Sequence, residues 1–253
     1  MFHFFNRKKT PLIDIIPHDF IDFHTHLLPG IDDGSKNLDE SVSLIKRMNG
    51  YGIRNFICTP HIMEGVWFNT PTIINKKLIE LKSYLKSLEI SDISITAAAE
   101  YMVDGNFNNL LKSKELITLD GEHILIELPY FNLPYKVYEI LFNIQMAGYK
   151  PILAHPERYV YLHKNYTEYQ KLKDAGCIFQ LNLLSLSTHY GKHIQTIALK
   201  LLKDNLIDLV ASDVHNHRHL DSLESIDNPS IVKLVKPLLK KNILDYNCPF
   251  STS

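Results

Sequence analysis

Residues 20–35, F-I-D-F-H-T-H-L-L-P-G-I-D-D-G-S, place two histidines and three carboxylates in and just after a short apolar run. The run 20–24 predicts a buried strand. His24 and His26 are two residues apart, so on a strand their side chains point to the same side. Polar groups at this density are costly to bury alone, which indicates a site at the strand end.

The composition is that of an ordinary globular chain. The 253 residues are 45% hydrophobic and 22% charged, enough for one large α/β domain. A formal net charge of −1 gives no bulk electrostatic reason to expect nucleic-acid binding. No apolar run approaches the ~18 residues that would span a bilayer. We therefore expect a cytoplasmic protein with no integral membrane segment.

The cysteines exclude thiolate phosphatase chemistry. Cys58, Cys177 and Cys248 are odd in number and widely spaced, which fits a reducing compartment. A thiolate phosphatase needs arginine six positions after its cysteine. Glu64 and Leu183 stand there after the first two cysteines, and the chain ends before that position after the third. Cys58 and Cys177 are expected to be core residues of strands.

Apolar segments rich in β-formers alternate with patterns of helical period. Strands are expected at 20–24, 55–60, 93–100, 123–128, 151–155, 177–182 and 207–213, and helices at 38–48, 72–88, 134–147, 166–175, 192–204 and 229–241. Such alternation is typical of a parallel sheet covered on both faces. Seven units without a linker favour one barrel-like domain at 20–253, preceded by an N-terminal arm at 1–19; an open doubly wound sheet is the alternative.

Ligand-type side chains follow six of the seven expected strands. They are His24, His26, Asp32 and Asp33, then His61, Glu100, Glu127, then His155, Glu157 and Arg158, and finally Asp213 and His215. Because the carboxyl ends of parallel strands converge on one face, these residues are expected to meet. Crowded carboxylates need countercharge, which metal cations supply.

The mixture of imidazole and carboxylate, without thiolate, suits zinc, manganese or iron, and about nine ligands could hold two or three ions. Multinuclear sites of this kind activate water and clamp both oxygens of an in-line displacement. Arg158 would bind a phosphate oxygen bidentately; the alternative for Arg158 is a surface salt bridge to Glu157 or a neighbouring residue.

These motifs resemble the PHP (polymerase and histidinol phosphatase) family, and more narrowly its manganese-dependent bacterial protein-tyrosine phosphatases of capsule and exopolysaccharide synthesis. The resemblance rests on D-F-H-T-H-L-L-P-G-I-D-D-G-S (22–35), T-P-H (59–61), E-L (127–128), A-H-P-E-R-Y (154–159) and A-S-D-V-H-N (211–216). It implies a single-domain, distorted (β/α)7 TIM-like barrel with two or three divalent ions, manganese first, with iron, zinc or magnesium possible.

The resemblance also implies a role for each motif residue. One metal would take His24, His26, Glu100 and Asp213, a second would share Glu100 and add Glu127 and His155, and a third would use Asp33, His61 and His215. Asp32 is the weaker ligand of the acid pair and is expected to support the site. Catalytic roles are expected for Arg158, Asp213 and His61.

Two further expectations concern substrate binding. Arg158 would bind the phosphate together with Arg218, although the sequence H-N-H-R-H around Arg218 departs from the family pattern, and His217 and His219 are expected to be loop residues. Loop aromatic residues could form a rim that accepts the substrate ring, namely Trp67, Tyr101, Tyr130, Phe131 and Tyr159. The alternative for each of them is ordinary packing of the loops against the barrel.

The implied reaction is hydrolysis of a phosphomonoester by metal-activated hydroxide. The expected substrate is a phosphotyrosine protein, in particular a tyrosine kinase of polysaccharide assembly. A phenolate leaving group, with a pKa of about 10, needs little protonation. The alternatives are a small-metabolite phosphatase of the histidinol-phosphate type, a nucleic-acid phosphoesterase disfavoured by the charge, and a non-catalytic metal-stabilised module. Arg158 argues against the last, because a structural site needs no phosphate anchor.

Overall fold

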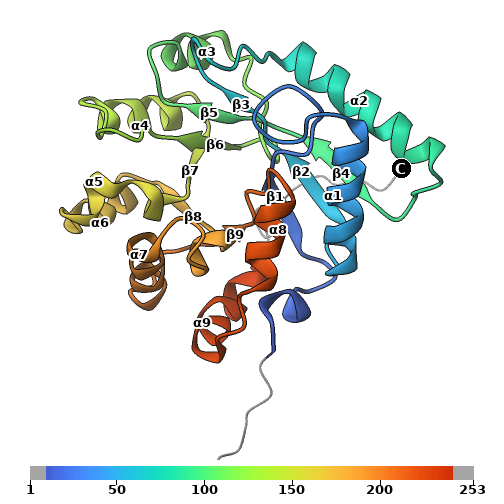
Figure 1. Ribbon diagram of the computed structural model, residues 1–253. Coiled ribbons are helices and arrows are strands. Elements are labelled where there is room, and N and C mark those ends of the chain that lie inside the picture. The colour runs from blue at the N-terminus through green and yellow to red at the C-terminus, as the bar shows by residue number, and fades with distance from the viewer. Residues whose placement is uncertain (1–9, 242–253) are drawn as a thin grey trace, which may run out of the picture.

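The computed structural model describes residues 10–241, in which parallel strands are surrounded by helices (Figure 1). The strands are β1 (Ile21–Thr25), β2 (Asn55–Cys58), β3 (His61–Ile62), β4 (Ser94–Ala97), β5 (Glu100–Met102), β6 (His123–Glu127), β7 (Lys150–Ala154), β8 (Ile178–Asn182) and β9 (Leu209–Ala211). They pair in a three-stranded sheet of order β1-β2-β4 and a six-stranded sheet of order β3-β5-β6-β7-β8-β9.

Two of the expected strands are each broken in the middle. The segment predicted at 55–60 forms β2 and then β3, and the segment predicted at 93–100 forms β4 and then β5. Pairing continues across the breaks, since the Glu100 N–H donates to the Pro60 carbonyl at 3.1 Å. The same two chain segments therefore join the two sheets into one layer of seven parallel strand paths.

The last strand returns beside the first. The Asp213 N–H donates to the His24 carbonyl at 2.8 Å, and the His26 N–H donates to the Val214 carbonyl at 3.0 Å. A few backbone hydrogen bonds, rather than a full ladder of them, join the first and last strands along this seam. The single-domain α/β fold is confirmed, and the broken strands and the short seam are its distortions.

Helices cover the outer side of the strands (Figure 1). They are α1 (Leu38–Gly50), α2 (Pro71–Ser87), α3 (Phe107–Ser113), α4 (Val137–Met146), α5 (Val160–His163), α6 (Thr167–Asp174), α7 (Lys192–Lys203), α8 (His217–Glu224) and α9 (Pro229–Leu239), with short 3-10 helices η1 (Leu12–Ile15), η2 (Pro156–Arg158) and η3 (Leu183–Leu186). The six predicted helices are confirmed within a few residues. Helices α3, α5 and α8 were not predicted, because each has eight residues or fewer and too few turns for a clear apolar period.

The inner face of the strand layer shows how mostly apolar strands can carry polar, ligand-type residues at their carboxyl ends. A buried cluster contains residues of β1, β2, β6, β7 and β9, among them Leu125 and Leu209. Side chains two apart on a strand share a face, so Glu127 follows Leu125 on the inner side of β6. Asp213 follows Leu209 in the same way beyond the end of β9. The interior is therefore apolar at the bottom and carries the ligand-type residues at the carboxyl ends.

The described part of the expected N-terminal arm packs against the domain. Leu12 in η1 is completely buried, and its N–H donates to the Ile226 carbonyl at 2.7 Å. Residues 1–9, which hold the aromatic and basic part of the arm, lie outside the described residues, as does Cys248. Cys58 and Cys177 are buried, as predicted. Within the described range, no helix combines the length and apolarity that crossing a membrane requires.

We expect Leu12→Ala to lower the free energy of unfolding by about 2–5 kcal/mol, because the change removes a fully buried side chain and leaves a cavity. Urea denaturation followed by circular dichroism measures the effect. Ile79→Ala on α2, where the side chain is 65% exposed, is the control and should change the value by no more than about 0.5 kcal/mol. Equal effects of the two substitutions would show that η1 is not part of the core.

Candidate metal centre

All nine side chains predicted as metal ligands lie together at the carboxyl ends of the strands. They fall into overlapping groups whose ligand atoms lie within 4.8 Å of one another: His24, His26 and Asp213; His24, Glu100 and His155; His61, Glu100 and Glu127; and His26, Asp33, His61 and His215. Most of these side chains are buried, whereas that of Asp33 is 57% exposed. Asp33 therefore lies at the entrance.

Glu100 occupies the middle of the centre. Its Oε2 lies 3.2 Å from His24 Nε2 and 3.0 Å from His61 Nδ1, and its Oε1 lies 3.1 Å from His155 Nε2. The carboxylate is fully buried, and burial alone would raise its pKa. The imidazoles of His24 and His61 outweigh burial, so the pKa of Glu100 lies well below its ordinary value. A single carboxylate thus faces three imidazoles in three directions.

Two neighbours determine which nitrogen of each histidine faces the centre. His24 Nδ1 lies 2.8 Å from Gln180 Oε1, and His26 Nδ1 lies 2.8 Å from Asp32 Oδ2. Both oxygens accept hydrogen bonds, so Nδ1 carries the proton and Nε2 keeps its lone pair. Asp32 supports the site, as the sequence predicted.

The inward-facing atoms test whether a cation fits. Within residues 10–241, His24 Nε2, His26 Nε2 and Glu100 Oε2 are buried without a hydrogen-bond partner. His24 Nε2 lies 3.2 Å and His26 Nε2 lies 3.5 Å from Glu100 Oε2, so all three atoms are directed at one buried volume. A cation placed among such atoms would satisfy all of them, and the donor set of imidazole and carboxylate suits divalent transition metals. The residues present fit a metal.

Asp213 connects the histidines to Arg158. Its Oδ1 lies 3.3 Å from both His24 Nε2 and His26 Nε2. Its Oδ2 accepts hydrogen bonds from Arg158 Nη1 at 2.9 Å and from Asn182 Nδ2 at 2.7 Å. Asp213 has a φ of 53°, a left-handed conformation that costs a residue with a side chain about 1–3 kcal/mol. The fold tolerates this cost at a position where one carboxylate oxygen faces the histidines and the other binds Arg158.

Arg158 lies between two aromatic rings. Its guanidinium carbon is 5.2 Å from the Tyr130 ring centroid and 4.6 Å from that of Tyr190. The alternative of a surface salt bridge is wrong, because Arg158 pairs with the buried Asp213, and Glu157 is itself buried and accepts the Asn182 N–H at 3.1 Å. The guanidinium of Arg158 is therefore held at the centre, with Nη1 directed to Asp213.

The comparisons with known proteins agree with this geometry. The family described as "Capsular polysaccharide synthesis, CpsB/CapC" matches residues 20–244. The chain belongs to this family. The resemblance to capsule-associated phosphatases drawn from the motifs is thereby confirmed.

Relatives within the CpsB/CapC family carry phosphatase names. The chain is 32% identical to tyrosine-protein phosphatase YwqE of Bacillus subtilis (strain 168) over 197 residues, covering 78% of this chain and 77% of the relative. It is 31% identical to tyrosine-protein phosphatase CpsB of Streptococcus pneumoniae over 202 residues, covering 78% and 83%. The prediction of a tyrosine phosphatase agrees with these names.

A solved structure shows the same fold. The matched chain belongs to the crystal structures of YwqE from Bacillus subtilis and CpsB from Streptococcus pneumoniae, which are described as unique metal-dependent tyrosine phosphatases. It superposes with a TM-score of 0.73 at 29% sequence identity. The match covers 88% of this chain and 95% of that chain. The CpsB/CapC fold thus extends over nearly all of both molecules.

The aromatic rim expected of this CpsB/CapC chain is only partly present. Tyr130 and Phe131 are exposed, and the Tyr130 hydroxyl donates to Glu127 Oε1 at 2.6 Å. Tyr101 and Tyr159 are completely buried, so for these two residues the rim is wrong and the alternative of ordinary packing is confirmed. Tyr101 directly follows Glu100 on β5 and must point to the opposite face, toward the helices. The Tyr159 hydroxyl donates to a strand carbonyl in the interior. Trp67 is partly buried in the loop after β3.

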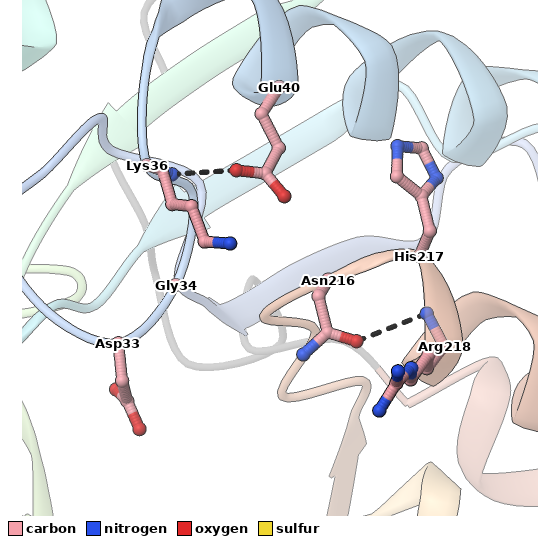
Figure 2. Close-up of a pocket in the computed structure, with 7 residues that line it drawn as sticks. All are labelled: Asp33, Gly34, Lys36, Glu40, Asn216, His217 and Arg218. Atoms are coloured by element: carbon pink, nitrogen blue, oxygen red, sulfur yellow. Dashed lines mark hydrogen bonds between the residues drawn. The ribbon is translucent and has the colours of Figure 1, made fainter.

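Arg218 lies apart from Arg158, at the edge of a pocket of about 420 Å³ beside Asp33. The pocket is lined by Asp33, Gly34, Lys36, Glu40, Asn216, His217 and Arg218, and Figure 2 shows Lys36 and Arg218 on opposite sides of it. His217 and His219 were expected in a loop, but they lie in the first turn of α8, which Asn216 caps through its side chain. Among the described residues, neither belongs to a ligand group.

Three supporting residues of β8 and its following loop were not predicted. Gln180 orients His24, Asn182 binds Asp213, and Tyr190 lies against Arg158. The strand at 177–182 was the one judged to carry no ligand-type residue. The missed signal is the two-residue spacing of Gln180 and Asn182, which places two amides on the inner face of the strand.

We expect Gln180→Ala to weaken metal binding by about 10–100-fold, because His24 loses the acceptor that fixes its ring and its tautomer. Metal retained after dialysis, measured by elemental analysis at graded free-metal concentrations, gives the affinity. Gln170→Ala, at an exposed position of α6, is the matched control and should bind metal as the unsubstituted chain does. Equal retention by both variants would contradict the proposed role of Gln180.

Proposed function

We propose that this chain is a metal-dependent phosphatase that hydrolyses phosphotyrosine in a protein of capsular or exopolysaccharide synthesis. The observation that carries the proposal is the double contact of Asp213. One oxygen faces the histidine nitrogens of the centre, and the other is bound by Arg158. A phosphate held by this arginine would therefore lie directly beside the metal position.

The proposed ligands divide the centre into three positions. His24, His26, Glu100 and Asp213 would hold one ion, Glu100, Glu127 and His155 a second, and Asp33, His61 and His215 a third. Glu100 belongs to two of the observed groups, which supports its shared place between two ions. The group of His26, Asp33, His61 and His215 supports the third position, with His26 beside it. We propose two or three divalent ions, manganese foremost, with iron, zinc or magnesium as alternatives.

The proposed chemistry assigns the protein groups to binding, orientation and charge. Divalent ions in such a centre supply a nucleophile from water at neutral pH and offset the charge of the phosphate. Arg158, which is permanently charged, would bind two phosphate oxygens and stabilise the negative charge that develops on them. His61 and Asp213 would be catalytic because both line the volume where the phosphate would lie. Phenolate is a stable enough leaving group to depart with little protonation.

The substrate side of the proposal follows the relatives. A tyrosine kinase of polysaccharide assembly is the proposed partner, and the cytoplasm is the proposed location. Arg218 would contribute to substrate binding from the pocket beside Asp33, where Lys36 adds a second positive charge. The sequence gives no sign of a nucleic-acid substrate, since the net charge is −1.

Metal removal should abolish hydrolysis of p-nitrophenyl phosphate, and added manganese should restore it. We expect His155→Ala and Asp213→Ala each to lower kcat by at least about a hundredfold, because each removes a proposed ligand of an ion that would offset the charge of the phosphate. Steady-state kinetics with metal content measured on the same samples checks both expectations. His193→Ala and Asp174→Ala, at exposed positions, are the matched controls. Full activity in the presence of chelator would refute the metal mechanism.

The substrate class is tested by comparing a tyrosine-phosphorylated peptide with histidinol phosphate on the metal-loaded chain. We expect a higher kcat/KM for the peptide, because the phenolate is the better leaving group and aromatic side chains flank the entrance. Phosphate release measures both reactions. A preference for histidinol phosphate would support the small-metabolite alternative instead.

A further inference from the structure

Exposed apolar side chains run from the loop before α4 along the helix itself. Phe131 and Tyr135 in the loop are 96% and 99% exposed. Tyr138, Phe142 and Met146 on α4 are 39%, 60% and 70% exposed and follow one another at intervals of four residues. Residues four apart lie along one side of a helix. We call these five residues the apolar stripe; several large apolar side chains exposed along one segment indicate a binding surface more strongly than a single one does.

The apolar stripe is continuous in sequence with the metal centre. Tyr130, the residue before Phe131, donates its hydroxyl to Glu127 and stacks on His155 with an interplanar angle of 19°. Its ring also lies 5.2 Å from the Arg158 guanidinium carbon. If a substrate chain places its phosphotyrosine against Arg158, the substrate residues next to that phosphotyrosine would therefore lie beside the apolar stripe.

The stripe offers apolar contact with little charge. Lys136 and Glu139 are the charged residues of the segment 130–146, and they pair with each other at 2.9 Å. The Tyr138 hydroxyl donates to Glu168 of α6, which holds the middle of the stripe in place. A fixed, neutral, apolar surface selects an apolar occupant in preference to an acidic or basic one.

The length of the stripe on α4 sets the size of the occupant. Eight residues separate Tyr138 from Met146, which at a rise of about 1.5 Å per residue is about 12 Å. An extended peptide rises about 3.3 Å per residue, so roughly four residues cover this distance. Alternate side chains of such a peptide face the same way, so about two of the four would contact the helix.

We propose that the apolar stripe binds the segment of the substrate protein next to its phosphotyrosine, and that this segment carries large aliphatic or aromatic side chains at alternating positions. The inference rests on the proposed function, because it assumes that a phosphotyrosine protein enters the metal centre. It adds a recognition rule that the metal centre itself does not contain.

The test uses two phosphotyrosine peptides and the metal-loaded full chain. One peptide carries leucine and phenylalanine at alternating positions on both sides of the phosphotyrosine, and the other carries serine and asparagine there. The test variant combines Tyr135→Ser and Phe142→Ser. The matched control combines Ile79→Ser and Leu88→Ser, which are 65% and 42% exposed at α2. Non-hydrolysable phosphonate versions of both peptides give binding constants by fluorescence anisotropy.

We expect the unsubstituted chain to prefer the apolar peptide by about 10–100-fold in kcat/KM and in binding, since burying one or two large side chains contributes on this scale. The stripe variant should lose this preference, the α2 control should keep it, and all three should hydrolyse p-nitrophenyl phosphate equally. Folding of each variant is checked by circular dichroism.

The outcomes separate the stripe from the proposed function. Equal use of the two peptides by the unsubstituted chain, or a preference that survives in the stripe variant, overturns the inference while phosphatase activity stands. A dimer that dissociates in the stripe variant, seen by sedimentation without any peptide preference, overturns it in favour of a second copy as occupant. Loss of all hydrolysis by the loaded chain overturns the proposed function, and the phosphonate peptides still decide the stripe.

Discussion

The central constraint on this molecule is the crowding of five imidazoles and four carboxylates, most of them buried, into one small volume. Lone pairs of His24, His26 and Glu100 face one another without a hydrogen bond within residues 10–241. Such an arrangement is unfavourable unless protons or cations occupy the space between the atoms. The parallel strands make it possible, because every one of them ends at this face. The apolar lower half of the interior, led by Leu125 and Leu209, supplies the rigid base on which the polar half stands.

Support around the ligands is as specific as the ligands themselves. Gln180 and Asp32 each accept a hydrogen bond from the outer nitrogen of a histidine. Asp213 is held in a left-handed backbone conformation so that its two oxygens serve different partners. The position of Arg158 follows from that of Asp213 and from the rings of Tyr130 and Tyr190. The proposed positions of the cation and of the phosphate would therefore share one carboxylate, that of Asp213.

The sequence was sufficient for the positions of the strands along the chain and for the residues that converge, since strand ends and ligand-type residues coincide. It left the arrangement open between a barrel and a doubly wound sheet. It was insufficient wherever three-dimensional pairing decides the outcome. The strand breaks that produce β3 and β5 depend on neighbouring strands, which local periodicity does not record. Tyr101 does not reach the rim because it follows Glu100 on β5. Successive side chains of a strand point to opposite faces, so Tyr101 faces away from the centre. Helix α8 was not predicted because histidines and an arginine occupy its first turn. The sequence feature that indicates this helix is the N-cap residue Asn216.

Asn182 shows where this architecture can change and where it cannot. Its side chain contacts Asp213 and Tyr190, and its N–H donates to Glu157, so it ties together the loops that follow β7, β8 and β9. Any replacement there would disturb three loops at once. Residues 131–135, in contrast, are mostly exposed and hold no ligand of the centre. The β6–α4 loop could therefore accept substitutions that change the surface beside the centre while every proposed ligand stays in place.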